Sequence, residues 1–392
     1  MSAGARSTAA AAAVGAAAGL WLAAVLPGRA APLRAPAAPV IEVVGFTPAE
    51  VELGGQRSVT VRGMLVNRGP GPAHAIHVSL TARRTPGGEI VGTGGGVSWL
   101  DALDEGESGP FSVGVRFCCL PDIGAYDLTT SAAAAPAPRY RDLAVDGLHE
   151  QTVDGEGRIY GHLRNTGAAY LNASATDVYA GFWQGEDLVE LQTARLPVFY
   201  TPDAPTGQSH PPGVAYPWAI AFPDVPFDRY QVWTFAAPFP TGVFPVPLAA
   251  EAVTAHRDVE GIVVRGELRS CGAVAVALVV IVVEARDGDG RLLEFGRAVL
   301  SLDDALDPGE RQRFAVTWPG VRTAVDPSRV TAAAYAIDTQ TVRPPAVPCP
   351  AAWPLGYLPW ASQAGHGPGA AAPPPPEGRP FPSIPSALNA RN

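Results

Sequence analysis

The sequence contains no lysine, so all 28 of its basic residues are arginine. Charged residues make up only 17% of the 392 residues, the net charge is −9, and neither sign forms a long run. A nucleic-acid-binding surface needs a clustered basic face, and electrostatic attachment to a membrane surface needs a polybasic segment. The sequence therefore predicts no nucleic-acid partner, and it predicts contact with a membrane only through the N-terminal segment described below.

Catalytic motifs are lacking as well. The sequence has no Gly-x-Ser-x-Gly, His-Glu-x-x-His or Cys-x-x-Cys motif. His74 and His77 are three residues apart in a predicted strand, so their side chains point to opposite faces and cannot ligate one metal ion. We therefore expect no catalytic residue, no metal site and no cofactor, and we expect that the protein is not an enzyme.

Glycine and proline are abundant, with 43 and 41 residues, and hydrophobic residues make up 47% of the chain. That hydrophobic content is sufficient for a core and argues against global disorder. At roughly 100–200 residues per domain, the length predicts two or three domains.

The N-terminus has the parts of a secretory signal. Arg6 supplies a charged start, Ala9–Leu26 is apolar, and small residues follow at Gly28 and Ala30. We interpret residues 1–31 as a cleaved signal peptide. The alternative is an uncleaved anchor, because an apolar run of this length is at the lower limit for spanning a bilayer. We expect an extracellular or cell-envelope location, with a single N-terminal transmembrane anchor as the alternative.

Three copies of one unit follow a Pro/Ala linker at residues 32–39. The copies align at Gly63, Gly161 and Gly266, and each spans about 100 residues. We place them at residues 40–132, 146–237 and 251–337, with linkers at 133–145 and 238–250. Residues 338–392 are rich in Pro, Gly and Ala and are expected to form a disordered tail.

Each repeat is all-β by pattern. Ile76, Val78 and Leu80 alternate with polar residues, for example, and turn residues separate such runs at regular spacing. Six or seven short strands in about 100 residues predict a β-sandwich. The aligned glycine lies in the inward-facing row. Either it makes room for an aromatic ring from the facing sheet, with Phe111, Trp218 and Phe314 as candidates, or it marks a strand bulge.

The pattern of a strand with a central glycine, an Asn-x-Gly turn and a Pro-Gly-Glu turn resembles the bacterial FxLYD-type immunoglobulin-like domains. Asn67–Gly69 and Leu306–Glu310 are the best matches, and the resemblance covers most of residues 40–340. It implies three tandem Ig-like antiparallel β-sandwich domains in a non-catalytic protein that acts in binding, adhesion or spacing at the cell surface, with an unknown protein or glycan as partner. The alternatives are a carbohydrate-binding accessory module and a hydrolase with a dispersed, unrecognised site.

The middle repeat is rich in aromatic residues. Those at outward positions of its strands are Tyr179, Trp183, Trp233 and Phe235. If exposed, they form a candidate binding face for a sugar or a protein. The alternative is that the loop at residues 195–215 or a neighbouring domain covers them, which the rarity of large exposed apolar patches favours.

The four cysteines are Cys118, Cys119, Cys271 and Cys349. A bridge between the adjacent Cys118 and Cys119 would be strained. Cys271 and Cys349 flank the third repeat and are a candidate disulfide that ties down the start of the tail. The alternative is four independent thiols.

One predicted strand of the third repeat is apolar on both faces. Val279, Ile281 and Val283 face inward, which leaves Val280 and Val282 facing outward. A strand of this kind is normally covered on both sides. We expect its cover to be the Trp353–Trp360 segment, the middle repeat or a partner chain.

Overall fold

Alternating apolar and polar residues give this chain β-strands along most of its described length. The computed structural model describes residues 38–341 except 54–55, 118–121, 154, 198–208, 239–243 and 322–324. The expected signal peptide and most of the expected tail lie outside the described residues. So do three of the cysteines, Cys118, Cys119 and Cys349, and the Trp353–Trp360 segment.

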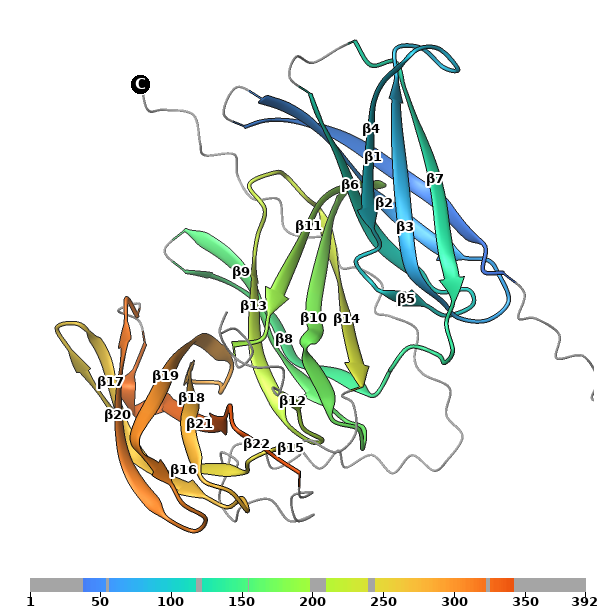
Figure 1. The fold of residues 1–392 in the computed structure, drawn as a ribbon. Coiled ribbons are helices and arrows are strands. Elements are labelled where there is room, and N and C mark those ends of the chain that lie inside the picture. The colour runs from blue at the N-terminus through green and yellow to red at the C-terminus, as the bar shows by residue number, and fades with distance from the viewer. Residues whose placement is uncertain are drawn as a thin grey trace, which may run out of the picture. The chain divides into compact units, whose positions relative to one another are not determined.

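The described chain is all-β, with antiparallel pairing and a β-sandwich-like character (Figure 1). The first repeat contains β1 (Ile41–Leu53), β2 (Gln56–Asn67), β3 (Ala73–Arg83), β4 (Ile90–Val97), β5 (Ala102–Leu103), β6 (Ser108–Phe117) and β7 (Ala125–Ala134). The middle repeat contains β8 (Leu143–Val153), β9 (Glu156–Asn165), β10 (Leu171–Gln184), β11 (Asp187–Arg195), β12 (Ser209–His210), β13 (Ala215–Ala221) and β14 (Arg229–Pro238).

The third repeat contains β16 (Leu248–Asp258), β17 (Gly261–Ser270), β18 (Val276–Arg286), β19 (Leu292–Leu306), β20 (Arg311–Pro319), the 3-10 turn η2 (Pro327–Arg329) and β21 (Val330–Ala336). Two short strands, β15 (Phe244–Pro245) and β22 (Thr339–Gln340), pair with each other. Strands therefore begin inside two segments expected to be linkers, at Leu143 and at Leu248. No helix in the described part of the chain has the length and hydropathy of a membrane span.

Each repeat has the same two layers of strands. Layer I is β1–β2–β6, β8–β9–β13 or β16–β17–β20, and layer II is β4–β3–β7, β11–β10–β14 or β19–β18–β21. In the first repeat, the pairing of Gly95 with Gly114 joins the two layers. The register of layer II shifts at equivalent points, between Ala82 and Arg83, Phe182 and Trp183, and Ala285 and Arg286. The repetition expected from the sequence is thus present in the strand order and in the bulges.

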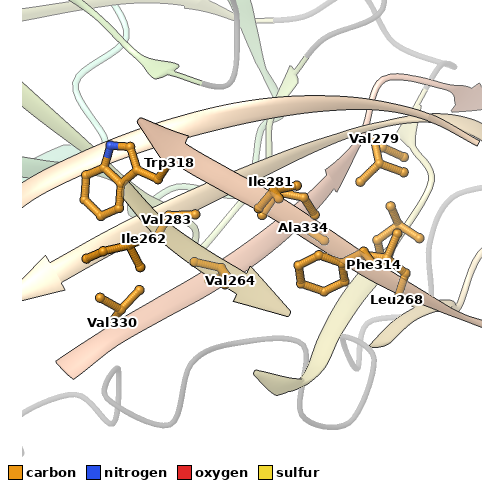
Figure 2. Packing of buried hydrophobic residues seen from close by; sticks show 14 of the residues in the cluster. Ile262, Val264, Leu268, Val279, Ile281, Val283, Phe314, Trp318, Val330 and Ala334 are labelled. Carbon is orange, nitrogen blue, oxygen red and sulfur yellow. The ribbon is translucent and has the colours of Figure 1, made fainter. Parts of the chain in front are cut away.

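The inner faces of the two layers share one hydrophobic core. In the third repeat, Ile262 and Val264 of layer I pack in one cluster with Val279, Ile281 and Val283 of layer II, as Figure 2 shows. The inward positions predicted for β18 are therefore confirmed. At about 25 cal/mol per Å² of apolar surface buried, such a cluster is the main stabilising contribution to each repeat.

The aligned glycines lie directly opposite aromatic residues. Gly63 pairs with Phe111, and a Cβ at Gly63 would come within 2.7 Å of the Phe111 ring. The aromatic belongs to the neighbouring strand of the same layer, so the expectation of a ring from the facing sheet was wrong. Alternation along a strand assigns each residue to a face of the sheet, but it does not identify the neighbouring strand. The other two repeats have the same arrangement, with Gly161 opposite Trp218 and Gly266 opposite Phe314.

A bulge also lies beside each of these glycines, on the strand at its other side. The register of β1 shifts between Val43 and Gly45, next to Gly63. A Cβ at Gly63 would lie within 2.1 Å of the Gly45 carbonyl oxygen. The close approach of backbone and ring together explains why glycine is required here.

A buried asparagine closes the turn after the second strand of the first two repeats. The Asn67 side chain donates to the carbonyl oxygens of Gly71 and Leu103, at 2.9 and 3.0 Å, and accepts from Gly69 N. Asn165 makes equivalent bonds in the middle repeat. The third repeat has Ser270 at this position, and Gln340 of β22 reaches back to accept from Ala273 N at 2.9 Å.

Candidate functional site

The outward aromatic residues of the middle repeat do gather on one face of layer II. Tyr179 of β10 lies opposite Trp233 of β14, and the rings of Trp183 and Trp233 are 5.7 Å apart. Gly181 makes room for them, because a Cβ there would come within 2.9 Å of both indole rings. The Arg229 guanidinium lies 4.8 Å from the centre of the Trp183 ring, at the distance of a cation–π contact.

This aromatic face is covered by the first repeat. Trp183 is 5% exposed, Trp233 and Phe235 are 9% exposed, and all three belong to the same hydrophobic cluster as the core of the first repeat. Tyr179 is half-buried, and its ring packs edge-on against Trp99 at 5.4 Å. The candidate face therefore lacks the exposure that a sugar-binding surface requires, and a neighbouring repeat is its cover.

Polar contacts accompany this apolar contact. Arg62 of β2 donates to the Val189 carbonyl oxygen at 3.0 Å and to Glu190 at 3.1 Å, both on β11. Their partly buried side chains form an ion pair between the first and middle repeats. Sequence reasoning missed this pair and had no signal for it, because its members are 128 positions apart.

The segment between the first two repeats is also held by ion pairs. Arg139 lies 2.6 Å from Glu107 and donates to the Thr234 carbonyl oxygen at 3.1 Å. Burial lowers the pKa of Arg139, although the charges of Glu107 and Asp104 act to raise it. Arg141 adds bonds to Asp104 and Glu107. This connection is fixed to both repeats, unlike a flexible linker.

The second contact between repeats covers the outer face of β18. Val280 and Val282 are each 1% exposed, and together with Ile337 they belong to the hydrophobic cluster of the middle repeat. The ring of Tyr335 packs on Tyr216 at 5.0 Å. The expectation that the outer face of this strand is covered is confirmed, and the cover is the middle repeat.

A buried polar cluster lies in the same contact. His162 of β9 places Nε2 3.1 Å from Oε2 of Glu284, and Arg286 donates to the same oxygen at 2.6 Å. An ionised carboxylate only accepts, so Nε2–H of His162 is the donor. Burial by itself raises the pKa of Glu284, but the hydrogen bonds and charges of His162 and Arg286 outweigh it and lower the pKa below its ordinary value.

His210 is a buried histidine that the sequence did not single out. Its Nε2 lies 2.8 Å from the Val214 carbonyl oxygen, so Nε2 carries the proton, and its ring packs on Tyr216. Burial lowers the pKa of His210 to about 4, although the bond to Val214 acts to raise it. His210 therefore stays neutral at neutral pH and supports the core of the middle repeat.

The structure describes both histidines of the close pair, His74 and His77, but only one of the four cysteines, Cys271. His74 and His77 lie on either side of a register shift in β3, and no described residues form a group of three or more potential metal ligands. Cys271 is disulfide-bonded. Because Cys349 lies outside the described residues, the pairing of Cys271 with Cys349 stays a prediction.

Outer faces of the layers thus join consecutive repeats at two contacts. Two buried apolar contacts account for the aromatic residues of the middle repeat and for the double-sided β18. The first also has the Arg62–Glu190 ion pair, and the second has the hydrogen bond between His162 and Glu284. Neither a protein-family model nor a curated protein matches this chain.

Proposed function

We propose that the chain is a non-catalytic secreted or cell-envelope protein that acts in binding, adhesion or spacing through tandem Ig-like domains. The observation that carries this proposal is the burial of outer sheet faces between consecutive repeats, at Trp183 and Trp233 and again at Val280 and Val282. Domains joined only by a flexible linker move relative to one another, whereas large apolar contacts restrict that motion. Fixed contacts of this kind suit a protein that sets a distance or presents a surface.

The chemistry of the buried polar groups supports the same proposal. Arg62 with Glu190, and His162 with Glu284, are occupied in contacts between repeats. Trp183, Trp233 and Phe235, three of the four aromatic residues considered for a carbohydrate-binding module, are buried in such a contact as well. We therefore propose no second function.

Distance measurements test the spacing role. Site-specific spin labels at the exposed positions Thr129 and Thr317 should give one narrow distance distribution in the full chain. The matched control is the same labelled chain carrying Val280→Asp and Val282→Asp, in which the distribution should broaden. A broad distribution in the parent chain would contradict a spacing role.

Export is tested separately. The chain, expressed in a bacterial host with its own N-terminus, should be recovered outside the cytoplasm, and mass spectrometry should find its first residue near Ala31. Retention of the whole chain in the cytoplasm would contradict a cell-surface role. Hydrolysis of ester, glycoside or peptide substrates by the purified protein would contradict the non-catalytic assignment.

A further inference from the structure

Layer I of the first repeat docks on layer II of the middle repeat through two side chains on neighbouring strands, Thr47 of β1 and Arg62 of β2, which lie opposite each other. Thr47 donates its hydroxyl to Asp187 at 3.0 Å, and Arg62 donates to the Val189 carbonyl oxygen at 3.0 Å. Both acceptors lie near the start of β11, an edge strand, where its register against β10 shifts. A threonine and an arginine thus mark the docking face of layer I, and a carboxylate beside a bulge marks that of layer II.

The contact between the middle and third repeats joins the same two layers. His149 of β8 occupies the position of Thr47, and its Nε2 lies 2.9 Å from the Leu292 carbonyl oxygen of β19. His162 of the same layer bonds to Glu284 of β18. The chain therefore uses one docking arrangement twice, with layer I of one repeat against layer II of the next. This leaves layer II of the first repeat and layer I of the third without a neighbouring repeat in the chain.

Layer I of the third repeat has the same threonine and arginine as layer I of the first. Thr254 of β16 lies opposite Arg265 of β17, directly before the aligned glycine, as Thr47 lies opposite Arg62. Thr254 and Arg265 are exposed. Arg265 forms no ion pair with another described residue, although three neighbouring arginines of this layer each do: Arg269, Arg311 and Arg313. The third repeat thus presents the donor pair of a docked layer I to solvent.

Layer II of the first repeat keeps features of a docked layer II. The residue just before the bulge of the edge strand is apolar in all three repeats, as Ile90, Leu188 and Leu292. Leu188 and Leu292 are 3% and 2% exposed, whereas Ile90 is 52% exposed. Glu89 precedes Ile90 as Asp187 precedes Leu188, so a carboxylate is in place as well. The first repeat thus presents to solvent the apolar residue and the carboxylate that the middle repeat uses for docking.

We infer that layer I of the third repeat docks on layer II of the first repeat of a second copy, so that chains associate head to tail. Thr254 and Arg265 then face Glu89 and the bulge beside Ile90, as Thr47 and Arg62 face Asp187 and the bulge of β11. Asp127, in the outward row of the same face, adds a second carboxylate. Donors come from layer I and a carboxylate from layer II, as inside the chain. A contact between two different faces leaves one of each free on every pair, so further chains can add.

This contact is weaker than those inside the chain. At the positions of Trp233 and Phe235, which anchor the first contact, the first repeat has Thr129 and Ser131. Buried aromatic anchors supply much of the binding energy of an interface. Repeats of one chain are also held at a high effective concentration, whereas two copies are not. Association is therefore reversible and depends on concentration.

Complementing variants test which faces meet. Ile90→Asp disables layer II of the first repeat, and Arg265→Glu disables layer I of the third by placing a carboxylate against Glu89. Sedimentation and small-angle X-ray scattering measure the mass of the parent chain, each variant and their equimolar mixture up to about 1 mM, which reveals micromolar to millimolar dissociation constants. Circular dichroism checks folding. The matched control is Val225→Asp, which places the same charge at an exposed apolar position of the middle repeat.

We expect the mass of the parent and of Val225→Asp to rise with concentration to at least twofold. Each disabled variant alone should associate at least about tenfold more weakly. Their mixture should reach twofold mass and stop there, because the intact layer I of one variant docks on the intact layer II of the other. Parent chain that keeps one-chain mass throughout overturns the inference. So does a mixture of folded variants that does not recover association, because the contact then joins other faces.

Hydrogen exchange of the parent needs no variant. Amides of residues 89–93 and 254–265 should exchange more slowly only at high concentration, and association without this protection also overturns the inference. The inference extends the proposed function by naming a second copy as a partner. Its failure is distinct from failure of the spacing role, because spin-labelled chains diluted into unlabelled chains report distances within one chain.

Discussion

Phe111 of β6 lies directly opposite Gly63 of β2, and its ring occupies the space that a side chain at position 63 would need. Gly161 with Trp218 and Gly266 with Phe314 repeat this relationship. Each repeat therefore fills the same part of its core with an aromatic ring from layer I. The glycine is required because the ring and the bulged strand approach it from both sides.

Gly63→Ala should destabilise the first repeat by about 1–3 kcal/mol, the usual cost of overpacking a filled core. Gly114→Ala is the matched control, since a Cβ there meets no atom closer than 3.7 Å. Chemical denaturation of both variants measures the difference. Equal unfolding midpoints for Gly63→Ala and the parent would show that the core adapts to the added methyl group.

Val280→Asp combined with Val282→Asp should disrupt the contact between the middle and third repeats. Burial of two valines contributes on the order of 3 kcal/mol, and the new carboxylates would also be buried. We expect a lower thermal midpoint and faster native-state proteolysis. The control is His77→Asp with Ser79→Asp, at the equivalent positions of the first repeat, which are exposed. Similar melting of the two double variants would refute the buried contact.

Glu284 should make the stability of the fold depend on pH in the acidic range. Its folded-state pKa is lower than in the unfolded chain, so it stabilises the fold above its ordinary value of about 4.3. That contribution is lost as pH falls through the folded-state pKa. Glu284→Gln should cost about 3 kcal/mol at neutral pH and flatten this part of the pH profile. Glu89→Gln, at an exposed site, controls for the loss of one carboxylate. The idea fails if both variants keep the parent's acid profile.

His210 should add a second pH dependence of stability, at higher pH than that of Glu284. Its folded-state pKa of about 4 lies below the unfolded value of about 6.5, so the unfolded chain takes up the proton first. Stability should fall by about 3 kcal/mol as pH is lowered from about 6.5 to about 4. NMR titration of the His210 ring measures this directly, and an ordinary midpoint near 6.5 would rule out a neutral buried ring.

Cys349→Ser should leave the Cys271 thiol free to react with a maleimide in the native protein. The parent chain should show no labelling at Cys271, because its sulfur is disulfide-bonded. Cys118→Ser is the control and should not change labelling at Cys271. Peptide mapping locates the label, and an unlabelled Cys271 in the Cys349→Ser variant would assign its bridge to another cysteine.

The strand pattern could be predicted from the sequence because each residue's face follows from alternation along one strand. The inward row of Val279, Ile281 and Val283, and the need to cover Val280 and Val282, both follow from that rule. The identity of the cover does not, since it depends on residues far apart in the chain. His162 and Glu284, for example, are 122 positions apart and share no motif.

Nothing in the sequence indicated that a glutamine from another segment replaces the buried asparagine in the third repeat. The third repeat lacks the asparagine that closes the turn in the other two, and the aligned position holds Ser270 instead. Gln340 supplies an acceptor from outside the aligned segment, so no comparison of aligned positions could have identified it.

The glutamine of β22 makes the turn of the third repeat depend on a segment that lies beyond the aligned part of the repeat. Asn67 and Asn165 bond to partners 36 and 45 residues away, inside their own repeats. Gln340 lies 67 residues from its partner Ala273 and follows the last core strand, β21. The turns of the first two repeats are therefore complete within the repeat, whereas the third repeat ends structurally only at β22.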